Sequence, residues 1–297
     1  MKNTVNIVVG ALTVAFGVLT VVGLAKKPGS VYKDEPSEQN PFEGHRVRFV
    51  EDPDDPVNAD GVRGHLEIVT SPSSPRKRGL YERYTKRCLD IVLSGFGLII
   101  LSPVYLLVGL AVYIDDPGPV LFTQKRVGRD KQFFKLHKFR SMKLSTPHDV
   151  PTHELKDPDK YITAVGRVIR KTSLDELPQV FDIWLGNMSV IGPRPALWNQ
   201  DKLTALRDSS VSASDGENSR AGAGEENDVD ANSCTPGLTG LAQIKGRDEL
   251  ELEDKAALDR EYVKNISFIT DLECFVGTIK SVLHHDGVVE GGTGARK

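Results

Sequence analysis

The sequence predicts a membrane-associated α+β fold: a mostly helical domain with short strands, a re-entrant membrane helical hairpin and one N-terminal transmembrane helix. Three observations predict it. Long apolar runs cover residues 5–25 and 91–114, short strand-like segments lie between helical ones, and two stretches are polar. The 297 residues are enough for one or two domains.

Composition and motif content exclude several classes of protein. The 38 Lys and Arg residues nearly balance 41 Asp and Glu residues, which argues against a nucleic-acid-binding protein driven by bulk charge. Three widely spaced cysteines, Cys88, Cys234 and Cys274, exclude a disulfide framework and a CxxC-type zinc site and are typical of a reducing compartment. The sequence has no GxxxxGK(S/T) and no HExxH motif, so a P-loop and a zincin site have no support.

The first apolar run, residues 5–25, predicts a transmembrane anchor over residues 1–27. A helix of this length spans roughly 30 Å, the thickness of a bilayer core. A cleaved signal peptide is the alternative, but its apolar part is only ~7–15 residues long. The run ends at Lys26 and Lys27, which favours a cytoplasmic C-terminal side.

The second apolar run, residues 91–114, contains no charged residue and has basic residues on both sides. Because basic flanks are usually cytoplasmic, a segment that enters and leaves by one face satisfies both flanks. Pro103 removes a backbone donor and bends a helix, and the Ser102 hydroxyl can bond a freed carbonyl. We therefore predict a re-entrant hairpin bent at Ser102-Pro103, with a proline-kinked spanning helix as the alternative.

Two polar stretches are predicted to lie outside the compact part of the chain. Residues 28–75 hold seven prolines and several acidic clusters, which predicts a linker, with a short strand at 65–70 as the alternative. Residues 208–233 are acidic and lack aromatic residues, which predicts an exposed, mobile insert. The compact domain is then 76–290, and 291–297 form a tail.

Within that domain, strands are predicted at 120–123 and 133–138 around a turn at 128–130. Residues 162–190 are predicted to form helical pieces. Residues 266–285 place apolar side chains on one stripe at three- and four-residue spacing, which is typical of a core helix or of a helix at a membrane surface.

The adjacent acids Asp175 and Glu176 are the first candidates for chemistry. Ser173 and Glu176 fit an S-x-x-E capping box, so the local sequence favours a helix start over catalysis. Pro178 does not suit that register, because the fifth helical residue should donate a backbone hydrogen bond. A helix capped by Asp175 would place Pro178 in the first turn, and this alternative stays open.

Several cations are candidates for binding an anionic ligand. Two prolines stiffen the backbone around Arg194, and a guanidinium held in this way suits bidentate phosphate binding, with an exposed turn as the equal alternative. Lys138, Arg140 and Arg247 are further candidates. Anionic lipid head groups would also explain the first two.

Three long motifs follow the charge-free segment with its central Ser-Pro: DDPGPVLFTQKRVGRDKQFFKLHKFRSMK, RKTSLDELPQVFDIWLGNMSVIGPRPAL and TPGLTGLAQIKGRDELELEDKAALDREYVKN. Together they resemble the bacterial sugar transferases, the monotopic phosphoglycosyl transferases. The resemblance covers about 81–200 and 234–288. The acidic insert interrupts it, and Leu241 stands where the family often has Trp.

The resemblance implies an enzyme that transfers a sugar 1-phosphate from a UDP-sugar to a polyprenyl phosphate, usually undecaprenyl phosphate, and releases UMP. This is the first membrane step of extracellular polysaccharide, capsule or glycoconjugate synthesis. It implies that 76–290 form a catalytic domain on the cytoplasmic face of the bacterial plasma membrane. The expected partners are the donor, the acceptor and the lipid bilayer, with a homodimer left open and no nucleic acid.

The resemblance also assigns roles to residues. Asp175 matches the nucleophile, which forms a covalent aspartyl phospho-sugar and so splits one difficult step into two. Glu176 matches the residue that helps to hold Mg²⁺, with Asp175 as a second metal-binding residue. Ser102-Pro103 match the membrane bend. The expected phosphate-binding residues are Arg170, Arg194, Lys138, Arg140 and Arg247.

Two other classes remain as alternatives. A non-catalytic membrane scaffold of an envelope polysaccharide complex would make the linker and the insert the functional parts. A glycosyltransferase of DxD type would use 157–159 or 52–54, which both lie in polar loop sequence. What favours catalysis is that the whole set is intact: Asp175, Glu176, Arg194 and Ser102-Pro103.

Overall fold

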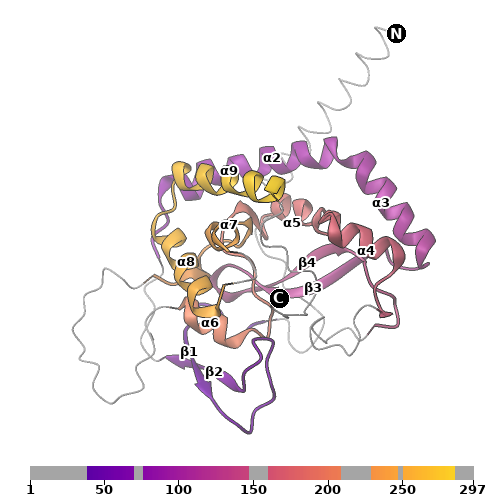
Figure 1. Cartoon of the computed structure of the whole chain (residues 1–297). Helices are drawn as coiled ribbons and strands as arrows, with labels where there is room; N and C mark the ends of the chain where they lie inside the picture. The colour runs from indigo at the N-terminus through magenta and orange to yellow at the C-terminus, as the bar shows by residue number, and fades with distance from the viewer. Residues whose placement is uncertain (1–38, 70–75, 147–159, 209–228, 247–249, 285–297) are drawn as a thin grey trace.

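Helices and short strands alternate in the computed structural model, which describes residues 39–69, 76–146, 160–208, 229–246 and 250–284 (Figure 1). The strands are β1 (Arg46–Glu51), β2 (Gly64–Val69), β3 (Leu121–Val127), β4 (Phe133–Phe139), β5 (Ser189–Ile191) and β6 (Gly237–Thr239). The α-helices are α2 (Lys86–Ile100), α3 (Ser102–Asp115), α4 (Ala164–Lys171), α5 (Gln179–Leu185), α6 (Asp201–Arg207), α7 (Leu241–Lys245), α8 (Leu252–Lys264) and α9 (Phe268–His284). The predicted mixture of helices and short strands is confirmed.

The strands of the described residues pair only two at a time. β1–β2 and β3–β4 are antiparallel hairpins, and β5–β6 is a parallel pair. The strands predicted around the turn at 128–130 are present and are longer than predicted. Helix α5 covers the free edge of β4. There, the backbone amide of His137 donates to Oδ2 of Asp182 of α5 at 2.9 Å, so this edge amide is satisfied.

The bend predicted at Ser102-Pro103 is present between α2 and α3. The helix axis bends by 60° between α2 and α3, and Leu101 is the single residue between the two helices. The Ser102 hydroxyl donates to the Ile99 carbonyl at 2.7 Å, and Pro103 lies in the first turn of α3, where its missing N–H leaves no bond unmade.

Only one arrangement in the described residues has the length and composition to cross a bilayer. No single described helix is long and apolar enough, whereas the bent pair Tyr81–Ile100 with Ser102–Asp115 passes both tests. The predicted anchor at 1–27 lies outside the described residues.

Helix α2 is amphipathic in the reverse sense: it buries polar side chains and exposes apolar ones. Lys86, Asp90 and Ser94 are buried, and Lys86 pairs with Asp271 of α9 at 2.6 Å, so the two helices run along one side of the molecule (Figure 1). Its exposed residues include Leu89, Val92, Leu93, Phe96 and Ile100. Those of α3 are Leu106, Leu107, Leu110, Tyr113 and Ile114, and those of α9 are Phe268, Ile269, Leu272, Phe275, Val276 and Ile279.

We call these exposed apolar side chains of the three helices together the α2–α3–α9 face. The helix predicted at 266–285 exists, but most of its stripe is part of this face rather than of the core.

The prediction of a linker over residues 28–75 is wrong for residues 39–69, which contain the β1–β2 hairpin. Val47 and Leu66 point to one side and pack with Ala205 of α6. The strands can form because Pro53 and Pro56 lie in the connection between them and leave both hydrogen-bond ladders intact. Residues 28–38 and 70–75 lie outside the described part.

The prediction of an exposed insert over 208–233 is wrong at both of its ends. Asp208 is fully buried, and Asp230 and Asn232 are largely enclosed. The reason is a buried cation: Lys131 Nζ lies 3.0 Å from Asp208 and 2.7 Å from Asp230. Paired in this way, acidic residues can enter a core. The central part, 209–228, lies outside the described residues.

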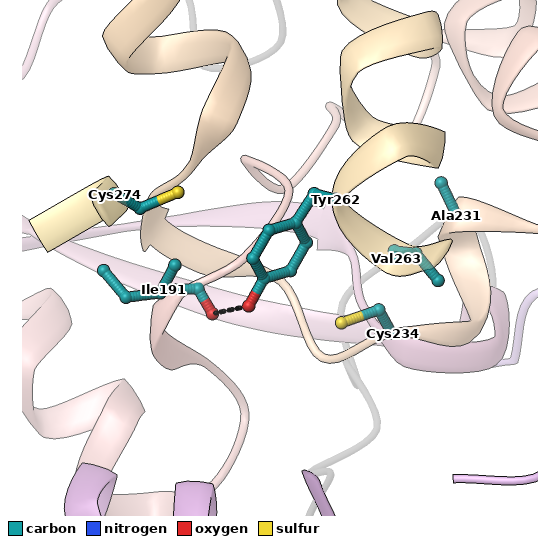
Figure 2. Packing of buried hydrophobic residues seen from close by; sticks show 6 residues of the cluster. All are labelled: Ile191, Ala231, Cys234, Tyr262, Val263 and Cys274. Carbon is teal, nitrogen blue, oxygen red and sulfur yellow. Dashed lines mark hydrogen bonds between the residues drawn. The ribbon is translucent and has the colours of Figure 1, made fainter. Parts of the chain in front are cut away.

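A small core joins the C-terminal helices to β5. Figure 2 shows Tyr262 of α8 among Ile191, Cys234 and Cys274, with its hydroxyl directed to the Ile191 carbonyl at 3.4 Å. The same hydroxyl donates to Asp271 at 2.6 Å. All three cysteines are free thiols, which agrees with the excluded disulfide framework. This core fixes the strand that leads into the Pro-Arg-Pro loop.

Candidate active site

Asp175 and Glu176 lie in a single 3₁₀ turn, Leu174–Glu176, between α4 and α5. The predicted capping box is wrong, because Ser173 has a left-handed backbone (φ 55°) and its side chain makes no cap hydrogen bond. The alternative with Asp175 as cap is also wrong, since Pro178 precedes the first residue of α5. The left-handed residue turns the chain away from α4, and such backbone strain is often found at functional sites.

Glu176 is held by two cations from distant parts of the sequence. Its Oε1 lies 2.6 Å from Nη2 of Arg194, in the loop after β5, and 3.1 Å from Nζ of Lys138, in β4. Burial opposes ionisation of Glu176, but the charges and hydrogen bonds of Arg194 and Lys138 together hold its pKa well below the usual range. Glu176 is therefore a carboxylate at any physiological pH.

Asp175 has a different environment, although it is the adjacent residue. Among the described residues no side chain donates a hydrogen bond to its carboxylate or forms an ion pair with it. Burial raises its pKa above the ordinary aspartate value, the charge of Lys138 opposes that rise, and the charge of Glu176 adds to it. Two neighbouring carboxyl groups with pKa values moved in opposite directions are typical of a divided catalytic role.

Arg126 of β3 is a site residue that the sequence analysis missed. It is partly buried, and burial together with the charge of Arg194 lowers its pKa to about 9, so it stays protonated at neutral pH. Its Nη1 donates to the Pro195 carbonyl at 3.0 Å, behind Arg194. In the sequence, Arg126 is one of the basic residues that follow the apolar run, and the strand predicted at 120–123 ends before it, whereas β3 continues to residue 127.

The other predicted cations are divided between the site and other places. Arg170 of α4 acts on Asp175, whose pKa its charge lowers. Arg140 is buried at the turn after α3, where it donates to the Asp116 carbonyl and lies 3.5 Å from its Oδ2. Its described contacts therefore hold the exit of the hairpin rather than Glu176. Arg247 lies outside the described residues.

The donor set of the turn fits the expected Mg²⁺. Asp175 and Glu176 offer carboxylate oxygens, the ligands that Mg²⁺ prefers, and the Asp175 carboxylate carries no side-chain partner among the described residues. A group of three metal-ligating side chains within the described ranges lies elsewhere, at Asp52, Asp55 and His65 on the β1–β2 hairpin. His65 there already pairs with Asp55 at 2.6 Å.

Comparison with known proteins identifies the family of the chain. The model of the bacterial sugar transferase family matches residues 81–285, which include every described residue of the site. The chain belongs to this family. The β1–β2 hairpin lies outside the matched range.

Three relatives illustrate the similarity. The chain is 36% identical over 220 residues to an undecaprenyl-phosphate galactose phosphotransferase of Salmonella typhimurium, covering 69% of this chain and 42% of the relative. It is 36% identical over 203 residues to a UDP-glucose:undecaprenyl-phosphate glucose-1-phosphate transferase of Escherichia coli, covering 66% and 40%. It is 35% identical over 211 residues to the exopolysaccharide production protein ExoY of Rhizobium meliloti, covering 66% and 84%. The chain thus spans about two fifths of the first two relatives.

Proposed function

We propose that this chain transfers a sugar 1-phosphate from a UDP-sugar to a polyprenyl phosphate, of which undecaprenyl phosphate is the expected form, and releases UMP. The reaction would be the first membrane step of extracellular polysaccharide or glycoconjugate synthesis. In support, two of the relatives are named as an undecaprenyl-phosphate galactose phosphotransferase and a UDP-glucose:undecaprenyl-phosphate glucose-1-phosphate transferase, and the third as an exopolysaccharide production protein. The observation that carries the proposal is the difference between two adjacent carboxylates in one turn. Among the described residues, Asp175 has no side-chain partner, whereas Glu176 is bound by Lys138 and Arg194.

The proposed nucleophile is the Asp175 carboxylate. One of its oxygens attacks the phosphorus that carries the sugar, the bond from that phosphorus to the bridging oxygen breaks, and UMP leaves with the electron pair. A phosphate oxygen of the polyprenyl phosphate then attacks the same phosphorus and displaces the carboxylate. The product is a polyprenyl diphosphate sugar, and Asp175 is regenerated.

The charge balance of the site supports a diphosphate substrate. Four cations, Arg126, Lys138, Arg170 and Arg194, surround two carboxylates, which leaves an excess of two positive charges. Fixed cations can stabilise the charge that develops on phosphoryl oxygens. Asp175 and Glu176 would hold Mg²⁺, which when bound neutralises further phosphate charge.

We propose that the α2–α3–α9 face contacts lipid and that α2 and α3 form a re-entrant hairpin. The reversed amphipathicity of α2 supports this, because exposed leucines next to buried Lys86 and Asp90 would be unfavourable in water. Basic residues on both flanks of the hairpin favour the cytoplasmic face of a bacterial plasma membrane. A donor from water and an acceptor from lipid could then meet at the Asp175 turn.

The test is UMP release by the full chain in nanodiscs with Mg²⁺, undecaprenyl phosphate and a panel of UDP-sugars. We expect lipid-dependent UMP from the wild type and Asp254→Asn, an exposed acid on α8, and none above background from Asp175→Asn. Mass spectrometry should find a sugar-phosphate adduct on Asp175. Full activity in Asp175→Asn would contradict the mechanism, and absence of both UMP and adduct across the panel would favour a non-catalytic scaffold.

A further inference from the structure

The β1–β2 hairpin, outside the range that the family model matches, holds the start of α6. The helix has no side-chain cap of its own. Instead, Oδ2 of Asp60, in the connection between the two strands, accepts a hydrogen bond from the Leu203 amide at 3.1 Å. The Ala59 amide donates to the Asn199 carbonyl at 3.0 Å. The hairpin therefore caps α6 from a distant part of the chain.

The same hairpin also holds the end of α6. The carboxylate of Asp208, directly after the helix, is fully buried, and β1 supplies two of its partners. Arg46 donates to Oδ1 through Nε, and the Val47 amide donates to Oδ2 at 2.8 Å. Lys131 Nζ is the third partner, at 3.0 Å. Since a buried charge is stable only when it is paired, these contacts fix the last turn of α6.

Arg207, one residue earlier, connects α6 to the active site. Its buried guanidinium pairs with Asp259 of α8, with Nη2 at 2.6 Å and Nε at 2.8 Å from Oδ2. Nη2 also donates to the Arg194 carbonyl at 2.8 Å. The Arg194 side chain in turn binds Glu176 at 2.6 Å. Arg207 thus touches the backbone of a site arginine but none of the reacting groups.

We propose that Arg207 is a positioning residue for Arg194 and that the β1–β2 hairpin is a working part of the active site because it fixes the helix that carries Arg207. The inference rests on the proposed function. A guanidinium fork can bind Asp259 and the Arg194 carbonyl at once, and this joins the two in one fixed geometry.

Two variants weaken this connection without leaving a buried charge unpaired. Arg207→Lys keeps a positive charge for Asp259 but replaces the fork by a single nitrogen. Arg46→Met removes one of the two contacts that β1 makes with Asp208, while Lys131 and the Val47 amide still bind this carboxylate.

The matched control is Arg48→Met, also in β1. Arg48 pairs with Glu67 at 2.7 Å, but both side chains are exposed, at 54% and 41%. Such a surface pair contributes little to stability. The control therefore removes the same side chain from the same strand without touching α6.

We expect Arg207→Lys and Arg46→Met to lower kcat/KM for the UDP-sugar by about 3- to 10-fold, the effect of losing one hydrogen bond, and Arg48→Met to change it by less than about twofold. The decisive measurement repeats both variants in an Arg194→Ala background. If they act through Arg194, their effect should disappear there, whereas a general loss of folding would be the same in both backgrounds. Thermal unfolding midpoints of all variants are measured alongside.

Equal losses in both backgrounds, or variants with the activity of the wild type, would overturn the inference while leaving the proposed function intact. Calorimetric binding of UDP to the same full-length proteins in nanodiscs separates the two ideas further. If the wild type binds UDP but releases no UMP, the proposed transfer is wrong. The positioning role is then still tested by UDP affinity: Arg207→Lys should weaken UDP binding when Arg194 is present and should have no effect in the Arg194→Ala background. A wild type that neither binds UDP nor releases UMP would overturn both.

Discussion

Replacement of Lys138 by Met tests why the pKa values of Asp175 and Glu176 are shifted in opposite directions. Lys138 Nζ lies 3.1 Å from Glu176, and its charge is the strongest that lowers the pKa of Asp175. Without it, Glu176 keeps its contact with Arg194 and stays ionised, while burial and the negative charge of Glu176 act on Asp175 against the charge of Arg170 alone. The pKa of Asp175 should therefore rise further.

The size of the effect follows from charge and exposure. An opposite charge within ~4–6 Å lowers the pKa of a carboxyl group by about 1–3 pH units. The Lys138 side chain is 19% exposed, and the solvent weakens the interaction. We therefore expect the acid limb of the profile of kcat/KM against pH to move up by about 1 pH unit. The direction follows because the nucleophile is active only as a carboxylate, which needs a higher pH when its pKa is raised.

The assay is UMP release in nanodiscs from pH 4.5 to 9, with Lys264→Met, an exposed lysine at the end of α8, as the control. The control should keep the acid limb of the wild type. At high pH the Lys138→Met enzyme should also be slower, because a cation of the site is lost. An unchanged or lower acid limb in Lys138→Met would refute the electrostatic account of Asp175.

Two further substitutions test the support of the Pro-Arg-Pro loop and the bend between α2 and α3. Arg126→Met removes the donor to the Pro195 carbonyl and a partly buried charge, and we expect kcat/KM to fall by about 10- to 100-fold because small displacements of a positioned group are costly. The control Arg167→Met, at an exposed arginine of α4, should change kcat/KM little. Pro103→Ala restores a backbone donor at the bend, so the distance between spin labels at exposed Leu93 and Leu110, measured by electron paramagnetic resonance, should lengthen. An unchanged distance would mean that the 60° bend does not depend on the proline.

The elements that could be predicted from the sequence are those set by local rules. The bend at Ser102-Pro103 follows from a missing donor and a nearby hydroxyl, and the structure has both, with the hydroxyl on the Ile99 carbonyl. The β3–β4 hairpin follows from its alternation and its turn. The Asp175-Glu176 site followed only from the resemblance, since the local sequence favoured a helix cap.

What could not be predicted depends on contacts between distant residues. The acidic ends of the insert looked exposed because their partner, Lys131, lies 99 positions before Asp230 in sequence, on the turn between β3 and β4. The segment before residue 76 looked unfolded because its composition is polar, yet two short strands without proline bury Val47 and Leu66. The predicted capping box failed because the left-handed backbone of Ser173 is set by the surrounding packing rather than by its own sequence.

The same long-range contacts explain how adjacent carboxyl groups can take different roles. Glu176 is held by Lys138 from β4 and by Arg194 from the loop after β5. The carboxylate of Asp175 has no such contact, and only the charges of Lys138, Glu176 and Arg170 act on it. Arg194 is itself fixed through its carbonyl by Arg207, and its neighbour Pro195 by Arg126. Because its backbone is held in this way, Arg194 cannot move freely to neutralise Asp175. The carboxylate that lacks a partner therefore stays available to attack, and the one that is paired keeps the cations where a phosphate would need them.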